Sequence, residues 1–493
     1  MVLGLLLTGL HAEQADGRVG GRAARWPAAA ASTGPEKKLI HAELFIDSER
    51  GRSQVRSCRG AASAQPGTDQ GSGSVRAGTT GQGSNSANVR HFNERVILTL
   101  LRRLGQASKA DLARHAGLTN NTAGVIVHEL EAQGLIRAHG KRTGARGQPA
   151  TLLSLDRDGA YAIGVRLGRR SLDTLLVNLV GDILDQRCRE GAFPLPAEAL
   201  AMMLDDVAAV RRAIPAAGAH RLAGIGLALP YNMGSWRREL DIPAAAADAW
   251  EGCDLAQELG ALTGLPVFAE NDGNAATIAE LFQGRGRELD DFVYLFVGAA
   301  IGGGVVIHGG CHRGVSGNGG DFGLMPVAGS RLATAPVPNR RFDILLTRAS
   351  LNSLIRHLRG SGVAVEAAAD LEAALRERAD LVGEWLDDSA DALAGPVLAA
   401  ACVLDAPAVV IDGDLPRAVL LDLIRRLEQV LAEAVAESRR PPRLLLGSIG
   451  RQAAAIGAAI LPLHVNYSAS PGVLLGQEPD GPGGRSETAR ARR

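Results

Sequence analysis

Hydrophobic and polar positions follow three different patterns along the chain. Over residues 92–104 apolar side chains recur every three or four positions, which predicts an amphipathic helix. Over 161–167 and 172–179 the alternation of apolar and polar residues favours β-strands. Short uninterrupted apolar runs at 222–229 and 292–297 are typical of strands buried on both faces. Helical and strand patterns alternate up to residue 475, which predicts an α/β fold.

The first 84 residues show no sustained periodicity. Residues 12–84 are rich in Gly, Ser, Ala, Arg and Gln, a composition that buries too little apolar surface to offset the entropy of ordering. We expect 1–84 to be a disordered extension, and 476–493 to be a disordered tail of similar composition. The opening MVLGLLLTGL is apolar but short and lacks a basic start, so it is a poor match to a signal peptide.

A small module of three helices and two strands is predicted after this extension. A capping-box pattern opens its second helix over 108–115, and Gly117 then allows a tight turn. A third helix is expected over 119–133, so that the pair forms a helix-turn-helix. Strands at 135–139 and 151–155 enclose the loop GKRTGARGQPA, which we interpret as a wing.

Positive charge is concentrated in this module, although the whole chain carries 53 basic and 53 acidic residues. Residues 85–155 hold ten basic and four acidic side chains, and contacts to DNA phosphates need such an excess. Asparagine can also read adenine edges in the major groove. The alternative is a helical bundle with a solvated basic face. We expect DNA contacts from Ser108, Lys109, Thr119, Asn120, Asn121, Thr122, His128, Lys141, Arg142 and Arg146.

A junction between a strand and a helix indicates a ligand site further along the chain. The apolar run 266–269 ends in Glu270-Asn271-Asp272, and a helix is expected over 274–282. Polar side chains at such a junction lie at the carboxyl edge of a sheet, where open α/β folds bind ligands. The alternative role for Asp272 is to cap the helix, which can coexist with ligand contact. A glycine-rich turn, 298–304, follows the next strand.

These segments, AENDGNAATIAELFQG, VYLFVGAAIGGGVVI and SGNGGDFGLMPV, resemble the ROK family (repressor, open reading frame, kinase), which has the actin-like ATPase fold. SKADLARHAGLTNNTAGVIVHELEAQGLI resembles the winged helix of ROK repressors of the xylose/N-acetylglucosamine type, which the family's kinases lack. The resemblance covers about 88–474. It implies an N-terminal winged helix-turn-helix at 85–155, followed by a two-lobed actin-like ATPase (RNase H-like) domain with lobes at 156–290 and 291–475.

The resemblance also suggests which residues bind a sugar. In family kinases the Asp of the END motif is the catalytic base and the preceding Asn binds the sugar, which correspond to Asp272 and Asn271 here. The family's sugar-binding Glu of Glu-x-Gly-His corresponds to Asp321. Asn232 follows the buried strand 222–229. We therefore expect Asn232, Asn271, Asp272 and Asp321 to contact a sugar or a sugar derivative.

Groups that family kinases use for phosphoryl transfer and zinc binding are replaced. Arg166 stands where the first hairpin carries an acidic metal ligand, unless it is an ordinary surface arginine. Leu324 replaces the zinc-binding His, and the loop that follows contains no cysteine. We interpret His308 and His312 as loop or core residues. The family's Gly-Gly pair near the nucleotide reads 412–414, Asp-Gly-Asp, which is poorly suited to phosphates. We expect no catalytic residues, no metal and no cofactor.

Five widely spaced cysteines with no C-x-x-C pair argue against disulfides and fit a reducing cytoplasm. No apolar run reaches the ~20 residues of a membrane helix.

We predict a cytoplasmic, non-enzymatic regulator, a repressor, that binds operator DNA as a homodimer or higher homo-oligomer, with a sugar as effector. Two alternatives are a sugar kinase carrying a DNA-binding module and a DNA-binding regulator that responds to no ligand.

Overall fold

The computed structural model describes residues 85–142, 150–168, 171–191, 193–231, 233, 244–337, 341–434 and 440–474. Both expected disordered ends therefore lie outside the described residues, as do Arg146 and Asn232. Lys141 and Arg142 are described as backbone of a strand, without their side chains.

The first described elements are the three helices expected from the sequence, α3 (Ser86–Leu104), α4 (Lys109–Ala116) and α5 (Asn120–Ala132). A small sheet of order β1-β3-β2 packs beside them, formed by β1 (Ala107–Ser108), β2 (Ile136–Arg142) and β3 (Ala150–Leu155). Ser108 and Asp111 form the expected capping box at the start of α4. The Thr119 side chain caps α5 by accepting a hydrogen bond from the Thr122 amide.

The next sheet has the order β6-β5-β4-β7-β8, an antiparallel meander continued by two parallel strands. Its strands are β4 (Tyr161–Leu167), β5 (Ser171–Asn178), β6 (Ile183–Glu190), β7 (Leu222–Leu229) and β8 (Val267–Asn271). One face packs on α6 (Pro196–Arg211) and α8 (Leu255–Thr263), with the short α7 (Ala244–Asp248) before α8. Trp250 lies in the connection between α7 and α8, since α8 begins only after its N-cap residue, Asp254.

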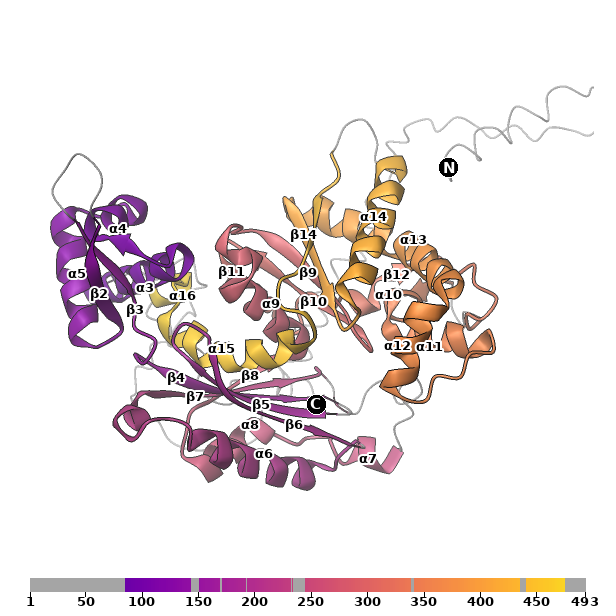
Figure 1. Cartoon of the computed structure of the whole chain (residues 1–493), viewed down its shortest axis with the longest axis horizontal. Helices are drawn as coiled ribbons and strands as arrows, with labels where there is room; N and C mark the ends of the chain where they lie inside the picture. The colour runs from indigo at the N-terminus through magenta and orange to yellow at the C-terminus, as the bar shows by residue number, and fades with distance from the viewer. Residues whose placement is uncertain are drawn as a thin grey trace, which may run out of the picture. The chain divides into compact units, whose positions relative to one another are not determined.

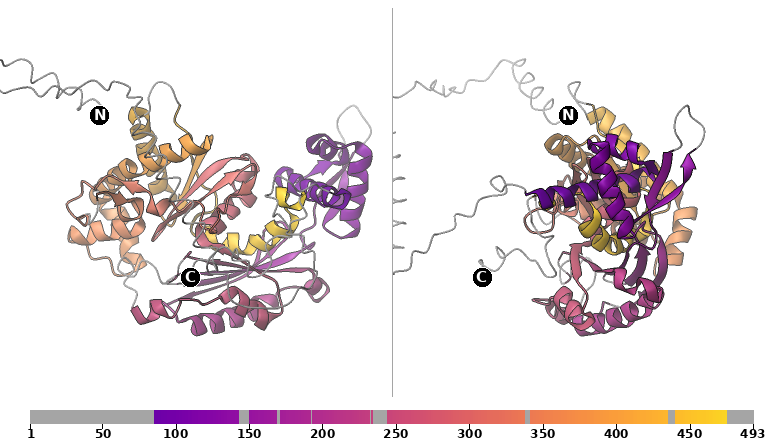
Figure 2. Two further views of the ribbon diagram at one scale, coloured as in Figure 1. Left: turned by 180° about the vertical axis from the view of Figure 1, so that it is seen from behind. Right: turned by 90° about the vertical axis from the view of Figure 1, so that its left-hand side faces the viewer.

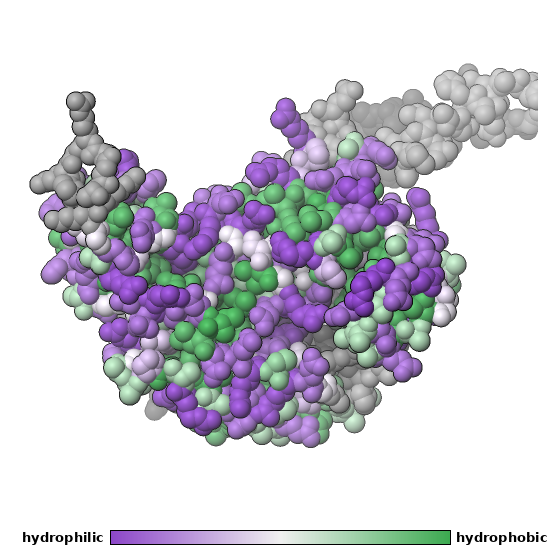
Figure 3. Space-filling view, in the orientation of Figure 1, coloured by the Kyte–Doolittle hydropathy of each residue, from purple (hydrophilic) through white to green (hydrophobic). Residues whose placement is uncertain are grey.

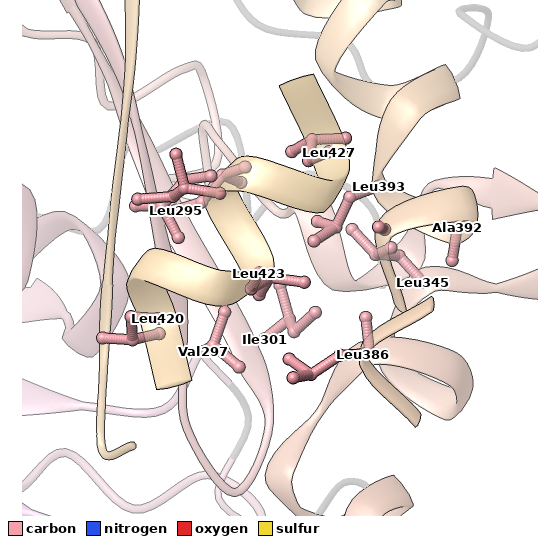
Figure 4. Packing of buried hydrophobic residues seen from close by; sticks show 14 of the residues in the cluster. Leu295, Val297, Ile301, Leu345, Leu386, Ala392, Leu393, Leu420, Leu423 and Leu427 are labelled. Carbon is pink, nitrogen blue, oxygen red and sulfur yellow. The ribbon is translucent and has the colours of Figure 1, made fainter. Parts of the chain in front are cut away.

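The other large sheet repeats this design with the order β11-β10-β9-β14-β15. Its strands are β9 (Phe292–Val297), β10 (Ile301–Ile307), β11 (Gly310–Cys311), β14 (Ala408–Gly413) and β15 (Arg443–Leu446), and a two-stranded sheet of β12 (Pro326–Val327) and β13 (Asp343–Ile344) follows β11 in the sequence. Helices that follow β13 pack around the core of this lobe: α10 (Leu345–Ala349), α11 (Leu351–Gly360), α12 (Ala368–Glu377), α13 (Ala379–Leu404) and α14 (Arg417–Ala434). Figure 4 shows leucines of α13 and α14 meeting Leu295 and Val297 of β9 in this core.

The glycine-rich stretch 298–304, which was expected to be a turn, is mostly strand. The expected glycine turn at 298–304 is only three residues long, since β10 already begins at Ile301. Gly302, Gly303 and Gly304 lie in β10, on which α9 (Asp272–Gln283) packs. A Cβ at Gly304 would collide with the Thr277 side chain of α9, and one at Gly273 of α9 would lie 2.7 Å from the Gly303 carbonyl oxygen. The glycines therefore allow the helix to pack on the strand.

The last long helix, α15 (Ala453–Tyr467), was expected in the second lobe but packs on β4 and β7 of the first sheet and on α9 (Figures 1 and 2). Small residues allow this packing. A Cβ at Gly164 or Gly226 would collide with the backbone of α15, and one at Gly457 with the backbone of α9. The sequence pattern could not reveal this, because the partners are some 180 to 290 positions apart along the chain.

The three-helix module shares its hydrophobic core with the first sheet. Buried side chains of α3 and β3 belong to one cluster with those of β4, β5, α9 and α15. The short α16 (Pro471–Leu474) also packs on α3. On the face drawn in Figure 3, hydrophilic side chains cover most of the surface and apolar ones gather in a few patches. Among the described residues, no helix combines the length and the hydrophobicity needed to cross a membrane.

Candidate functional site

The junction of β8 and α9 brings the predicted sugar-contacting side chains to the carboxyl edge of the first sheet. Asn271, the last residue of β8, caps α9: its Oδ1 accepts hydrogen bonds from the amides of Gly273 at 2.8 Å and Asn274 at 3.3 Å. The alternative role of Asp272 as the helix cap is therefore wrong. Asp272 is the first residue of the helix, and its Oδ1 accepts the Gly273 amide at 2.9 Å.

Asp321 joins this junction through a residue that the sequence did not single out. The Asn271 side chain donates to Asn318 Oδ1 at 3.3 Å, and Asn318 Nδ2 donates to Asp321 Oδ2 at 2.8 Å. Burial raises the pKa of the Asp321 carboxyl, and the charge of nearby Asp272 raises it further. The structure thus gathers three of the four expected ligand residues and adds Asn318. The only sequence signal for Asn318 was a polar side chain among glycines, three positions before Asp321.

An ion pair between the buried Glu270 and the exposed Arg313 holds the loop that carries Asn318. Arg313 Nε lies 2.7 Å from Glu270 Oε2, and Arg313 Nη2 donates to the Ala269 carbonyl at 3.3 Å. The Asn274 side chain donates to Glu270 Oε1 at 3.2 Å and to the Gly317 carbonyl at 3.3 Å. Burial raises the pKa of Glu270, while Arg313 opposes the shift. These contacts tie the loop to β8 and α9, so they fix the position of the Asn318 amide.

The residues beside this junction do not fit the zinc ion of the family's kinases. Leu324 is half exposed and offers no donor atom to a metal. Within the described ranges, no three His, Cys, Asp or Glu side chains are grouped so that they could hold a metal ion. His308 lies in the turn between β10 and β11, and His312 follows β11 with an exposed side chain. Both are loop positions.

The hairpin of β4 and β5 does not fit a magnesium–nucleotide complex. Arg166 Nη1 donates to Ser171 Oγ at 2.8 Å and lies 3.1 Å from Asp173 Oδ2, its partner across the two strands. The Arg166 side chain is about 31% exposed and paired with this carboxylate. A guanidinium in this position supplies no oxygen ligand to a metal and neutralises the nearest carboxylate.

The residues expected to contact DNA fall into two groups. Lys109, Asn120, Asn121, Thr122 and His128 are exposed, four of them on α5. Ser108 is 7% exposed and is occupied by the capping box, and Thr119 caps α5 while remaining exposed. The apolar stripe of α5 is buried as expected: Ala123, Ile126, Val127 and Leu130.

Three arginines of α3 bind groups of this protein, and one of them, Arg102, is buried. The Arg102 guanidinium lies over the Phe282 ring of α9, 3.6 Å from its centroid, and burial lowers the pKa of Arg102 to about 9. Arg95 Nη1 donates to the Val465 carbonyl at 2.9 Å, and Arg103 pairs with Asp290. The count of basic residues therefore overstated the positive charge that this module offers to a phosphate backbone.

Comparison with known proteins agrees with this geometry. An uncharacterized protein of Sinorhizobium fredii, y4fQ, is 28% identical over 379 residues, covering 75% of this chain and 90% of that protein. The xylose repressor of Bacillus subtilis is 25% identical over 239 residues, which span 48% of this chain and 61% of the repressor. A crystal structure of a ROK family transcriptional regulator, a homolog of the E. coli MLC protein, has a TM-score of 0.58 and 22% identity over 80% of this chain and 100% of its own. The model of the ROK family matches residues 162–464, more than half of the chain. The chain has the actin-like fold and belongs to the ROK family.

Proposed function

We propose that the protein is a sugar-responsive transcriptional regulator, a repressor, that binds operator DNA through a winged helix-turn-helix. The observation that carries this proposal is the two-sided character of α5. Its apolar side is buried against α3 and α4, while Asn120, Asn121, Thr122 and His128 are exposed. A recognition helix needs this arrangement, with a fixed apolar side and amide-bearing side chains free to meet base edges.

The effector is a small molecule rich in hydroxyl groups. Asn271, Asp272, Asn318 and Asp321 supply amide and carboxylate groups at one sheet edge, and carboxylates accept hydrogen bonds from sugar hydroxyls. The name of one similar protein, the xylose repressor of Bacillus subtilis, agrees with regulation by a sugar. Effector binding alters DNA binding only if the two lobe arrangements differ in affinity for it.

A ROK-family sugar kinase with an added DNA module is the rival function. The Arg166–Asp173 pair argues against it, because a kinase must present oxygen ligands to magnesium near the phosphates. The rival predicts ATP-dependent phosphorylation of a hexose by the purified chain. Our proposal predicts no such product.

A symmetric operator would further require a homodimer or higher homo-oligomer.

The DNA-binding part of the proposal is tested with the duplex upstream of the protein's own gene. We expect the full chain to prefer this duplex over random DNA at physiological salt. Replacing Asn120 and Asn121 together by alanine should lower affinity for the promoter roughly tenfold to hundredfold, because base contacts are lost. Affinity for random DNA should change little, since phosphate contacts carry it. Gln133→Ala, an exposed change at the end of α5, is the matched control. Equal promoter affinity in the double variant and the control contradicts the role assigned to α5.

The effector part is tested by thermal shift with a panel of hexoses, pentoses, amino sugars and their phosphates. A sugar that binds should raise the Tm of the wild type by mass action. Asp272→Ala should weaken that sugar roughly tenfold to hundredfold, because a charged hydrogen-bond acceptor is lost. Glu258→Ala on the exposed side of α8 removes the same charge elsewhere. A wild type that responds to no sugar in the panel favours the alternative regulator without an effector.

A further inference from the structure

The outward face of α5 carries an apolar side chain near its centre. Val125 is 50% exposed, more than any other large hydrophobic residue that the structure describes within 85–155. At about 100° per residue it lies roughly 40° from Asn121 and roughly 60° from His128 around the helix axis, so these two exposed polar residues flank it. On the opposite side of α5 lie its buried residues, Ala123, Ile126, Val127 and Leu130.

The same face lacks the cations that bind a phosphate backbone. The sequence of α5, NNTAGVIVHELEA, contains neither Lys nor Arg. Exposed cations of the module lie on other elements, with Lys109 on α4 and Arg137 on β2. Phosphate contacts position a protein on DNA without reading its sequence, and here they fall to these neighbouring elements. What α5 itself presents is amide, imidazole and apolar surface.

Packing within the chain accounts neither for Val125 nor for the glycine before it. Val125 belongs to none of the hydrophobic clusters of the described residues, and a Cβ added to Gly124 would have nothing within 4 Å. Glycine weakens a helix interior relative to alanine, and so does a side chain branched at Cβ. A helix backbone without a side chain can, however, come close to another molecule.

Thymine carries the apolar group of the major groove. Its 5-methyl group projects from the base edge, where small apolar side chains contact it. Adenine presents N7 and N6–H₂ in the same groove, and one asparagine amide can bind both. Asn121 and Val125 are one helical turn apart, about 6 Å along the axis at 1.5 Å per residue. An amide and an apolar side chain at that spacing can reach adjacent base pairs.

We propose that Val125 reads thymine through its 5-methyl group, and that Gly124 lets the helix come close enough to the base edges for this contact. Asn121 binds an adjacent adenine, so the operator half-site contains A·T pairs where this face of α5 meets it. The inference rests on the proposed DNA-binding function and deepens it, because it names the base that the apolar centre of α5 selects.

The test compares the duplex upstream of the protein's own gene with the same duplex in which uracil replaces every thymine. Uracil pairs as thymine does and lacks only the methyl group. We expect the full wild-type chain to bind the uracil duplex roughly threefold to tenfold more weakly, because the burial of one or two methyl groups is lost. Val125→Ser should bind the thymine duplex more weakly by a similar factor and bind both duplexes equally. Val125→Thr keeps one methyl group and should retain part of the preference for thymine.

Two further variants serve as controls for the surface and for the fold. Val89→Ser makes the same change at a valine of α3 that is 41% exposed, and it should leave the preference for thymine unchanged. Gly124→Ala should raise the Tm and yet lower the affinity for the thymine duplex roughly threefold or more, because the added methyl group holds the helix away from the bases. A purely structural role for Gly124 predicts no loss of affinity.

Three results would overturn the inference and leave the proposed function standing. One is a wild type that prefers its promoter over random DNA but binds the uracil and thymine duplexes equally. Another is an equal loss with uracil in the wild type and in Val125→Ser, which would mean that the methyl groups act through the shape of the duplex. The third is undiminished promoter affinity in Gly124→Ala. A wild type with no preference for its own promoter would instead contradict the proposed function itself.

Discussion

Gly457→Ala is expected to lower the Tm of the full chain by roughly 5 °C or more, which corresponds to about 3 kcal/mol or more of lost stability. Gly457 lies inside α15 where this helix crosses α9, and an added Cβ would overlap the Ala275 carbonyl oxygen. Backbone cannot move aside as a flexible side chain can. The two helices would have to separate along their whole contact, which is the centre of the first lobe.

Gly124→Ala is the matched control for this prediction. Gly124 is also inside a helix, α5, and an added Cβ there has nothing within 4 Å. Alanine should therefore raise stability by about 0.5–1 kcal/mol, since it loses less entropy on folding than glycine does. Thermal unfolding of both variants beside the wild type gives the comparison. Similar Tm values for the two variants would mean that α15 and α9 are not in the close contact described.

Asp388→Ala is expected to destabilise the second lobe by roughly 3–5 kcal/mol, because it leaves the buried Arg348 guanidinium with only the partly exposed Asp391 as an ion-pair partner. Arg348 is only 1% exposed in its side chain and lies 2.7 Å from Asp388 Oδ1. Its Nη2 also donates to the Asp388 carbonyl at 2.9 Å. Asp388 further accepts hydrogen bonds from Ser330 Oγ at 2.9 Å and the Arg331 amide at 3.2 Å. The segment 330–331 and the helix α10 thus both depend on one carboxylate of α13.

The adjacent residue supplies the control, and pH supplies a second readout. Asp387 has a side chain 70% exposed and pairs with Arg426, so Asp387→Ala should cost less than about 1 kcal/mol.

Burial raises the pKa of Asp388, but its contacts with Arg348 outweigh this, and the net pKa is lowered. A lowered folded-state pKa adds stability above the unfolded pKa of about 3.9 and loses it as pH falls below that value. Lowering the pH should therefore reduce the difference in free energy of unfolding between the wild type and Asp388→Ala. A difference that stays constant down to pH 3 would contradict the stabilising role assigned to the Asp388 carboxylate.

Much of the secondary structure could be predicted from local patterns. The strands β7 and β9 begin and end where the apolar runs do, because a strand buried on both faces is apolar from end to end, and β4 covers the alternating stretch 161–167. The glycines of β10 misled the sequence analysis, since glycine is typical of turns. Here glycine is required by α9, whose position relative to β10 no local pattern contains.

The candidate site could be predicted only as far as its motif extends. Asn271 and Asp272 follow a strand directly, so chain order alone placed them at the sheet edge. Asn318 belongs to a loop whose position depends on the Glu270–Arg313 ion pair, between residues 43 positions apart. The same limit applied to Arg102, which the sequence showed only as one of the ten basic side chains of residues 85–155. Its real partner, Phe282, becomes visible only when α3 and α9 are packed together.

Because α3 shares a hydrophobic core with the first sheet, the three-helix module must move together with that sheet. Helix α3 has 19 residues and is therefore about 28 Å long at 1.5 Å per residue. Its C-terminal turns are held by α9 and α16, so a tilt of about 5° there would carry its free end through roughly 2–3 Å. That distance is comparable to one hydrogen bond. Under the proposed function, a rotation of the lobe by a few degrees would thus be enough to bring α5 into or out of register with the bases of an operator.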